Sequence, residues 1–116
     1  MKRVKFLWKS TCSTCRNARA FLRDELGAEL EERDYAKQKF SQADLKDLFK
    51  GVDPRDYLNP KSPIYKQMGL KGKTLSAEQA IKLMATEPNL IKRPLTVVGT
   101  TIIAGFDRDV LRAAMK

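Results

Sequence analysis

Two short β-type runs near the C-terminal end, separated by only two residues, limit the fold of this chain more than any other feature. Leu95-Thr-Val-Val98 and Thr101-Ile-Ile-Ala104 are rich in β-branched residues, and Gly99-Thr100 joins them. A two-residue junction that contains Gly is typical of a β-hairpin. We therefore expect an antiparallel pair of strands in this region.

A strand followed by a helix is predicted at the N-terminal end. Val4, Phe6 and Trp8 alternate with Lys5 and Leu7, as they do in a short strand. Apolar residues then recur at helical spacing before a glycine that is placed to end the helix; they are Ala18, Phe21, Leu22 and Leu26, followed by Gly27. A weak alternation over Glu31–Tyr35 predicts a second strand, with a loop as the alternative.

The segment from about residue 41 to residue 88 is predicted to be a helical insertion. Ser41 is placed to begin one helix, and Ser76-Ala-Glu-Gln79 has the pattern of a capping box at the start of another. Asp53-Pro54 and Ser62-Pro63 each put a capping side chain before a proline at the first helical position. Two short helical turns are expected there.

The predicted order of elements is strand, helix, strand, helical block, hairpin and helix. Asp107 caps the last helix, which bears Val110, Leu111 and Met115. This order predicts an α/β fold in which helices flank a mixed sheet. Because the chain has 116 residues and no internal repeat or long linker, we expect one domain over residues 1–116.

The charge of the chain favours anionic partners, since 23 Lys and Arg residues face 14 Asp and Glu residues and the formal charge is +9. Small oxyanions, the glutathione carboxylates, acidic protein surfaces and nucleic acid all fit, as does a basic surface without a function. The charges are scattered and no RNA-binding motif accompanies them, so we expect no direct nucleic-acid contact. No signal-peptide core or membrane-spanning run is found, and a cytoplasmic protein without membrane contact is expected.

The two cysteines of the chain, Cys12 and Cys15, stand at the predicted strand-to-helix junction. A structural zinc site normally has four ligands, and with no histidine in the chain it would need carboxylates or a second chain. Covalent haem attachment needs a histidine where Arg16 stands. In the cytoplasm, where thiols are kept reduced, two cysteines this close together more often take part in redox chemistry than form a permanent disulfide. Two inert core cysteines are the other alternative, but their neighbours are polar.

The position of Cys12 just before the helix predicts a reactive thiol. Unpaired backbone N–H groups and the positive end of the helix dipole favour the thiolate there, and Lys9, Arg16 and Arg19 add positive charge. Thiols in such settings have pKa values of roughly 3.5 to 7.5 instead of about 8.5. We therefore predict that Cys12 is a nucleophile near neutral pH and that Cys15, nearly one turn into the helix, resolves its mixed disulfides.

Three motifs resemble those of the arsenate reductase and Spx-like (ArsC/Spx) family, a branch of the thioredoxin superfamily with a helical insertion in its sheet. The first is Cys12-Ser-Thr-Cys15-Arg-Asn-Ala-Arg19. The second is Tyr65-Lys-Gln-Met-Gly-Leu70, in the insertion. The third is Ile91-Lys-Arg-Pro-Leu-Thr-Val-Val98, followed by Gly105-Phe106-Asp107. The resemblance covers essentially the whole chain.

The resemblance implies a thioredoxin-like fold and a thiol-disulfide oxidoreductase. Cys12 would be its nucleophile, and Arg93 and Pro94 would lie opposite Cys12 and share a cis peptide bond. Arg93 would offer a fork of N–H donors to a thiolate, an oxyanion or a carboxylate. Further substrate contacts are expected from Lys9, Ser13, Thr14, Arg16 and Pro94.

The expected substrate is arsenate or a disulfide. No bound cofactor or metal is expected; glutathione, glutaredoxin or thioredoxin would return the electrons, and the protein would be a monomer. The C-x-x-C spacing also resembles that of Spx regulators, which bind RNA polymerase and sense oxidation through this pair. A redox-sensing transcription regulator is therefore the alternative function.

Overall fold

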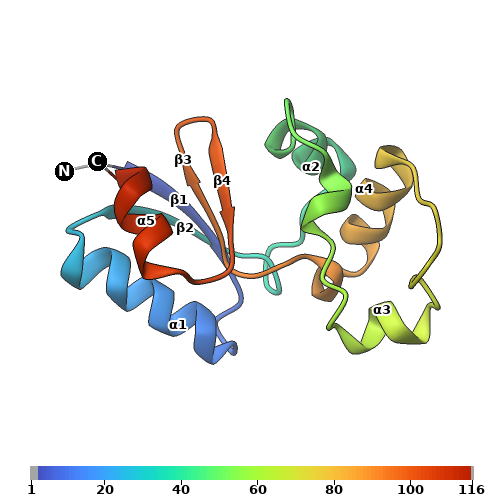
Figure 1. The fold of residues 1–116 in the computed structure, drawn as a ribbon, viewed down its shortest axis with the longest axis horizontal. Helices are drawn as coiled ribbons and strands as arrows, with labels where there is room; N and C mark the ends of the chain where they lie inside the picture. The colour runs from blue at the N-terminus through green and yellow to red at the C-terminus, as the bar shows by residue number, and fades with distance from the viewer. Residues whose placement is uncertain (1–2, 116) are drawn as a thin grey trace. The chain divides into compact units, whose positions relative to one another are not determined.

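A four-stranded mixed sheet is the framework that carries the cysteine pair. The computed structural model describes residues 3–115, and its strands lie in the order β2-β1-β3-β4 (Figure 1). β1 is parallel to β2 and antiparallel to β3, and β3 is antiparallel to β4. The strands are β1 (Arg3–Trp8), β2 (Glu29–Asp34), β3 (Leu95–Val98) and β4 (Thr101–Ala104). The predicted α/β fold with a mixed sheet is confirmed.

The hairpin between β3 and β4 has the predicted bounds. Leu95 pairs with Ala104 and Val98 pairs with Thr101, which leaves two residues in the turn. Gly99 has a φ of +62° in this turn, a conformation that side-chain-bearing residues rarely adopt. Because β3 also pairs with β1, the hairpin and the N-terminal strand belong to one sheet.

Two helices pack on one face of this sheet. α1 (Ser13–Ala20) continues into a π-helical turn (Phe21–Glu25), and α5 (Arg108–Met115) follows β4. The buried cluster between the helices and the strands includes Val4, Phe6, Ala18, Phe21, Leu22, Val98, Ile103 and Leu111. Burial of each large apolar side chain stabilises the fold by about 1.5–3 kcal/mol. Val110 of α5, in contrast, is 46% exposed.

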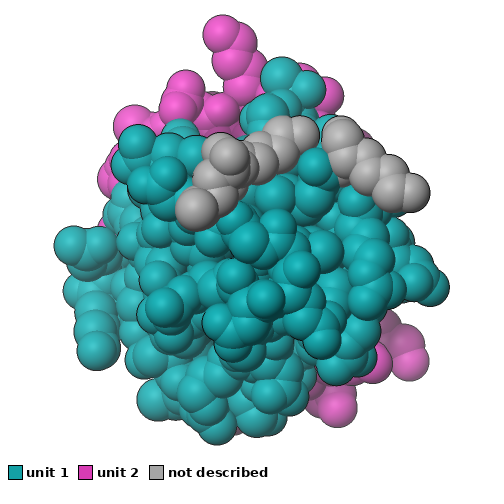
Figure 2. All heavy atoms as spheres, turned by 90° about the vertical axis from the view of Figure 1, so that its left-hand side faces the viewer, with its two compact units in different colours: residues 1–38, 93–116 teal, residues 39–92 magenta. Residues whose placement is uncertain are grey.

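The chain divides into two compact units, which have different colours in Figure 2. Unit 1 comprises Met1–Gln38 and Arg93–Lys116 and contains the sheet, and unit 2 comprises Lys39–Lys92. The helical elements of unit 2 are α2 (Gln42–Leu48), η2 (Pro54–Tyr57), α3 (Pro63–Gln67), α4 (Ala77–Thr86) and η3 (Pro88–Leu90). Unit 2 corresponds to the predicted helical insertion. The single domain over residues 1–116 stays a prediction.

Side-chain caps begin α2, η2 and α4 where the sequence predicts them. Ser41 and Ser76 each form a complete capping box, with Asp44 and Gln79 as their respective partners. Asp53 accepts the backbone N–H of the second residue of η2 at 3.0 Å. Such caps satisfy backbone N–H groups that a helix leaves unpaired.

The predicted cap by the Ser62 side chain is wrong. The Ser62 hydroxyl is buried and does not cap α3, because the Ser62 carbonyl accepts the Tyr65 N–H at 3.1 Å in its place. The strand predicted over residues 31–35 also differs, since β2 runs from Glu29 to Asp34. Its parallel pairing with β1 fixes these ends, whereas Leu30 is its only apolar residue and gives little alternation.

Candidate functional site

Cys12 is the N-cap residue of α1, and its sulfur points at the first turn of that helix. The Cys12 Sγ accepts the N–H of Cys15 at 3.4 Å. The Cys12 N–H donates to the Lys9 carbonyl at 2.9 Å, which closes the turn between β1 and α1. The sulfur therefore occupies the position at which a helix N-terminus presents unpaired N–H groups.

The two cysteines are free thiols with opposite surroundings. Cys15 is 0% exposed, whereas Cys12 is half-buried. Burial is the largest influence on the pKa of Cys12 and raises it, but hydrogen bonds from Cys15 and Thr14 and the charge of Arg93 outweigh it, so the pKa is lowered. Burial raises the pKa of Cys15 to about 12, and the neighbouring Cys12 sulfur adds to this effect. One sulfur thus favours the thiolate and the other stays protonated at neutral pH.

Arg93 and Pro94 precede β3, and the peptide bond between them is cis, which confirms the prediction. The buried Pro94 is fixed by its carbonyl, which accepts the Gly105 N–H at 2.9 Å. The charge of Arg93 acts to lower the pKa of both Cys12 and Cys15. The guanidinium therefore lies near the two sulfurs.

Tyr35 is a member of this cluster that the sequence does not single out. It is 2% exposed, directly follows β2, and donates its N–H to the Trp8 carbonyl at 3.1 Å. Burial raises the pKa of its hydroxyl; the charge of Arg93 opposes this rise, and both cysteines add to it. A protonated phenol thus shares the site with the guanidinium and the thiols.

The loop between β1 and the cysteine pair is held through Ser10. Its hydroxyl donates to Asp34 Oδ2 at 2.6 Å, and its N–H donates to the same oxygen at 3.3 Å. Its carbonyl accepts an N–H of Arg16 at 2.9 Å. Some burial acts to raise the pKa of Asp34, but the bonds from Ser10 and from the Ala36 N–H outweigh it and lower the pKa. Asp34 is therefore an ionised acceptor at neutral pH.

The other predicted substrate-contacting residues take different positions. Lys9 and Thr14 reach the cysteines through backbone groups. Ser13 is the exposed first residue of α1, and Arg16 directs a guanidinium N–H at the loop that precedes Cys12. The structure thus brings Cys12, Cys15, Arg93, Lys9 and Thr14 together.

The predicted contribution of Arg19 to the charge near the thiol is wrong. Its guanidinium forms an ion pair with Glu32 of β2 at 2.7 Å, and it lies 5.4 Å from the centre of the Trp8 ring. A carboxylate of β2 and an aromatic ring of β1 thus hold this guanidinium.

Ser10, Asp34 and Tyr35 are the site residues that sequence reasoning missed. A signal for Asp34 and Tyr35 was present, because they are the last two residues of the second strand predicted over residues 31–35. Asp34 is the register partner of Trp8 in the parallel β1–β2 pair. Since the carboxyl ends of parallel strands meet at one edge of a sheet, residues that follow β2 lie beside the cysteine loop that follows β1.

Fold and site together define a thioredoxin-like α/β protein with a cysteine pair at a helix N-terminus. The model of the ArsC family matches residues 7–114. This chain belongs to the ArsC family. Among residues 3–115, no helix has the length and apolar character needed to cross a membrane.

Known relatives and solved structures agree with this membership. The chain is 36% identical to the uncharacterized protein YusI of Bacillus subtilis over 91% of this chain and 92% of YusI. It is 26% identical to the global transcriptional regulator Spx of Streptococcus pyogenes over 95% of this chain and 83% of Spx. A solved arsenate reductase from Vibrio cholerae, 24% identical, has the same fold, with a TM-score of 0.82 over 97% of this chain and 98% of that one.

Proposed function

We propose that this protein is a thiol-disulfide oxidoreductase in which Cys12 attacks and Cys15 resolves. One observation carries the proposal. The Cys12 sulfur accepts the Cys15 N–H at the N-terminus of α1 and is exposed to the positive charge of Arg93, while the Cys15 side chain is buried. A thiolate in such a position is a nucleophile at neutral pH, and the protonated Cys15 is available to react in a later step.

The first step is attack of the Cys12 thiolate on one sulfur of a substrate disulfide. A bond forms between Cys12 Sγ and that sulfur, the substrate S–S bond breaks, and the other substrate sulfur leaves as a thiolate. Arg93 is placed to stabilise the negative charge that moves from Cys12 to the leaving sulfur.

The second step is attack of Cys15 on the Cys12 sulfur. The Cys12 thiolate is one cause of the raised pKa of Cys15, and this cause disappears once Cys12 is in a mixed disulfide. Cys15 then gives its proton to the thiolate that left in the first step or to water, forms the Cys12–Cys15 disulfide and releases the rest of the substrate as a second thiolate. Two electrons pass from the cysteine pair to the substrate.

A thiol reductant must return two electrons to the Cys12–Cys15 disulfide. Glutathione, glutaredoxin or thioredoxin would serve, in the cytoplasm and with the protein as a monomer. Arsenate is the other candidate substrate, with Arg93 as its principal cation and Lys9, Ser13, Thr14, Arg16 and Pro94 as further candidate contacts.

Trapping of the mixed disulfide tests this proposal. With glutathione disulfide, the Cys15→Ser variant should accumulate one glutathione on Cys12, since the resolving thiol is missing. The wild type should instead form the intramolecular disulfide, and both products are distinguished by mass spectrometry of the intact protein. Absence of an adduct on Cys12 in the variant would contradict the proposal. Parallel assays with arsenate and each reductant identify the substrate.

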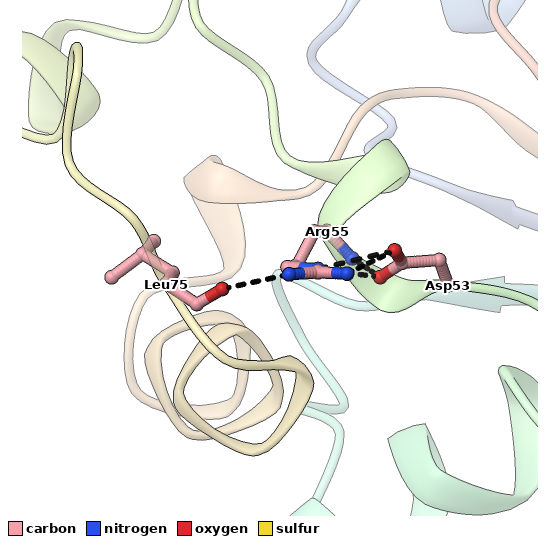
Figure 3. A network of polar contacts seen from close by, with 3 residues as sticks. All are labelled: Asp53, Arg55 and Leu75. Carbon is pink, nitrogen blue, oxygen red and sulfur yellow. Dashed lines mark hydrogen bonds and ion pairs between the residues drawn. The ribbon is translucent and has the colours of Figure 1, made fainter.

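A second candidate function is a redox-sensing regulator that binds RNA polymerase, as the Spx relatives suggest. A groove of about 650 Å³ in unit 2 is the candidate contact surface for such a partner. Its lining includes Met68, Leu70, Lys73, Leu75, Lys82 and Leu83. Arg55 fixes one wall, because it donates to the Leu75 carbonyl at 3.2 Å and pairs with Asp53 at 2.7 Å (Figure 3).

Binding to purified RNA polymerase separates the two functions. Under the regulator function, binding should depend on oxidation of the cysteine pair and should be lost in Met68→Glu, which puts a charge in the groove. Val110→Glu is the matched control, because Val110 is also an exposed large apolar residue, at 46% against 37% for Met68. Turnover without polymerase binding would leave the oxidoreductase as the function.

A further inference from the structure

The loop that carries Cys12 is held from two sides at a single residue, Ser10. All of its hydrogen-bonding groups are engaged: the hydroxyl and the N–H with Asp34, and the carbonyl with Arg16. Asp34 ends β2, the strand paired with β1, and Arg16 lies in α1, which follows the loop, so two different elements hold the loop. The 2.6 Å distance from the Ser10 hydroxyl to Asp34 is that of a strong, charge-assisted hydrogen bond.

The acceptor of this bond is itself fixed. Asp34 Oδ1 accepts the Ala36 N–H at 3.0 Å, and the Asp34 carbonyl accepts the N–H groups of Lys37 and Gln38 at 3.0 and 2.9 Å. Because β2 is paired with β1 up to Asp34 itself, the carboxylate has little freedom to follow a moving loop. Ser10 is therefore tied to a rigid point of the sheet.

The contact that Ser10 supports depends strongly on position. Only Thr11 separates Ser10 from Cys12, whose sulfur accepts the Cys15 N–H at 3.4 Å. Electrostatic contacts of this kind weaken quickly with distance and misalignment. A loop released at Ser10 would carry the sulfur away from the helix N-terminus for part of the time.

We propose that Ser10, held by Asp34 and Arg16, is the positioning residue that keeps the Cys12 sulfur at the N-terminus of α1 and so maintains its reactivity. This inference rests on the proposed function, because it concerns the same nucleophile. It assigns Arg16 a part in holding the loop, which differs from the direct substrate contact predicted from the sequence.

The inference is tested by the pH dependence of Cys12 alkylation, read separately for each cysteine by peptide mass spectrometry. Ser10→Ala removes the hydroxyl and changes no charge. We expect the alkylation midpoint of Cys12 to rise by about one pH unit, which corresponds to about tenfold slower alkylation below both midpoints. Ser10→Thr keeps a hydroxyl and should restore the wild-type midpoint.

The direction in which the alkylation midpoint of Cys12 moves distinguishes positioning by Ser10 from a direct effect of the Asp34 charge. The titratable and charged groups that face it include Cys15 of α1, Tyr35 after β2 and Arg93 before β3, and the Ser10 variants keep all of them. If Asp34 acted on Cys12 only through its negative charge, Asp34→Asn would lower the midpoint and Ser10→Ala would leave it unchanged. Positioning predicts a higher midpoint in Ser10→Ala.

Ser41→Ala is the matched control, since Ser41 also pairs with an aspartate, Asp44, but in unit 2. Equal midpoints in wild type, Ser10→Ala and Ser41→Ala would overturn the inference alone. A wild-type midpoint at or above about 8.5, the ordinary value for cysteine, would instead contradict the thiolate of the proposed function.

Discussion

The N-terminus of α1, in unit 1, is built from different atoms than those of α2 and α4, in unit 2. In unit 2, Ser41 and Ser76 accept backbone N–H groups through hydroxyl oxygens at 3.0 and 3.1 Å, within complete capping boxes. In unit 1, the cap of α1 is the sulfur of Cys12, at 3.4 Å from the Cys15 nitrogen. Sulfur is a weak acceptor as a thiol, so this cap gives α1 less stability than a serine would.

The first turns of these helices differ in charge as well. α2 has Asp44 and α4 has Glu78 in the first turn, whereas α1 has no acidic residue there. Carboxylates at a helix N-terminus interact with the positive end of the helix dipole and stabilise the helix by about 0.3–1 kcal/mol. In α1 that positive end is left to the Cys12 sulfur, and this difference from α2 and α4 supports the proposed reactivity of Cys12.

Replacement of the cap atom gives the largest expected effect. Cys12→Ser should reduce thiol-disulfide turnover on the order of 10³-fold or more, because the nucleophile is gone. Serine is a preferred N-cap residue, so at a pH where Cys12 is protonated the free energy of unfolding should stay equal or rise by up to about 1 kcal/mol in the variant. Turnover with glutathione disulfide and urea unfolding measure the two effects. Retained turnover would show that Cys12 is not the nucleophile.

Alkaline pH should destabilise the protein through Cys15. Its pKa is raised to about 12 by burial, so between pH about 9 and 12 the unfolded state loses this proton first and the free energy of unfolding falls as pH rises. At pH 11 the contribution is on the order of 2 kcal/mol. Cys12, with a lowered pKa, contributes in the opposite sense, and its stabilisation is lost as pH falls through the folded-state value.

Urea unfolding at a series of pH values checks this effect, with Cys15→Ser as the comparison. The variant should show a smaller alkaline decline than the wild type, and the part that Tyr35 contributes should be common to both. Identical declines in the two proteins would mean that Cys15 is not held protonated by its burial.

A carboxylate added to the first turn of α1 should make it resemble α4. Thr14→Asp places a negative charge beside the Cys12 sulfur, and we expect alkylation of Cys12 at neutral pH to slow about tenfold, which corresponds to a pKa rise of about one unit. Thr14→Asn is the matched control without the charge. Equal rates in the two variants would show that the helix terminus does not control the thiol.

Loss of a serine cap in unit 2 should have the smallest effect. Ser76→Ala removes the acceptor for the Gln79 N–H and should cost about 1 kcal/mol of stability, measured by thermal or urea unfolding. Alkylation of Cys12 should stay at the wild-type rate. A change in that rate would mean that the caps of the two units are not separate in function.

Much of the fold could be predicted because its signals are local. Gly99 and the β-branched runs beside it are enough for the hairpin, and Ser41 and Ser76 are enough for two helix starts. β2 was harder to place, because its ends depend on pairing with β1 and Leu30 is its only apolar residue. Ser62 is of a residue type that often caps helices, yet its side chain is buried and its carbonyl, not its hydroxyl, accepts an N–H of α3.

The site was predictable only in part, for the same reason. Cys12 and Cys15 follow from a local spacing, and the cis bond of Arg93 and Pro94 followed from the family resemblance. Tyr35 and Asp34 reach the site through the parallel register of two strands, which composition does not reveal. The orientation of the Arg19 side chain likewise depends on its partner Glu32, which lies on β2 and not on the helix of Arg19.

Titration of the two sulfurs by their thiolate ultraviolet absorbance tests the central claim most directly. Comparison of Cys15→Ser, Cys12→Ser and the wild type assigns each ionisation to one residue. We expect Cys12 to ionise below the ordinary cysteine value of about 8.5 and Cys15 to ionise far above it. Two ordinary pKa values, or a lowered value for Cys15 and not for Cys12, would contradict this claim.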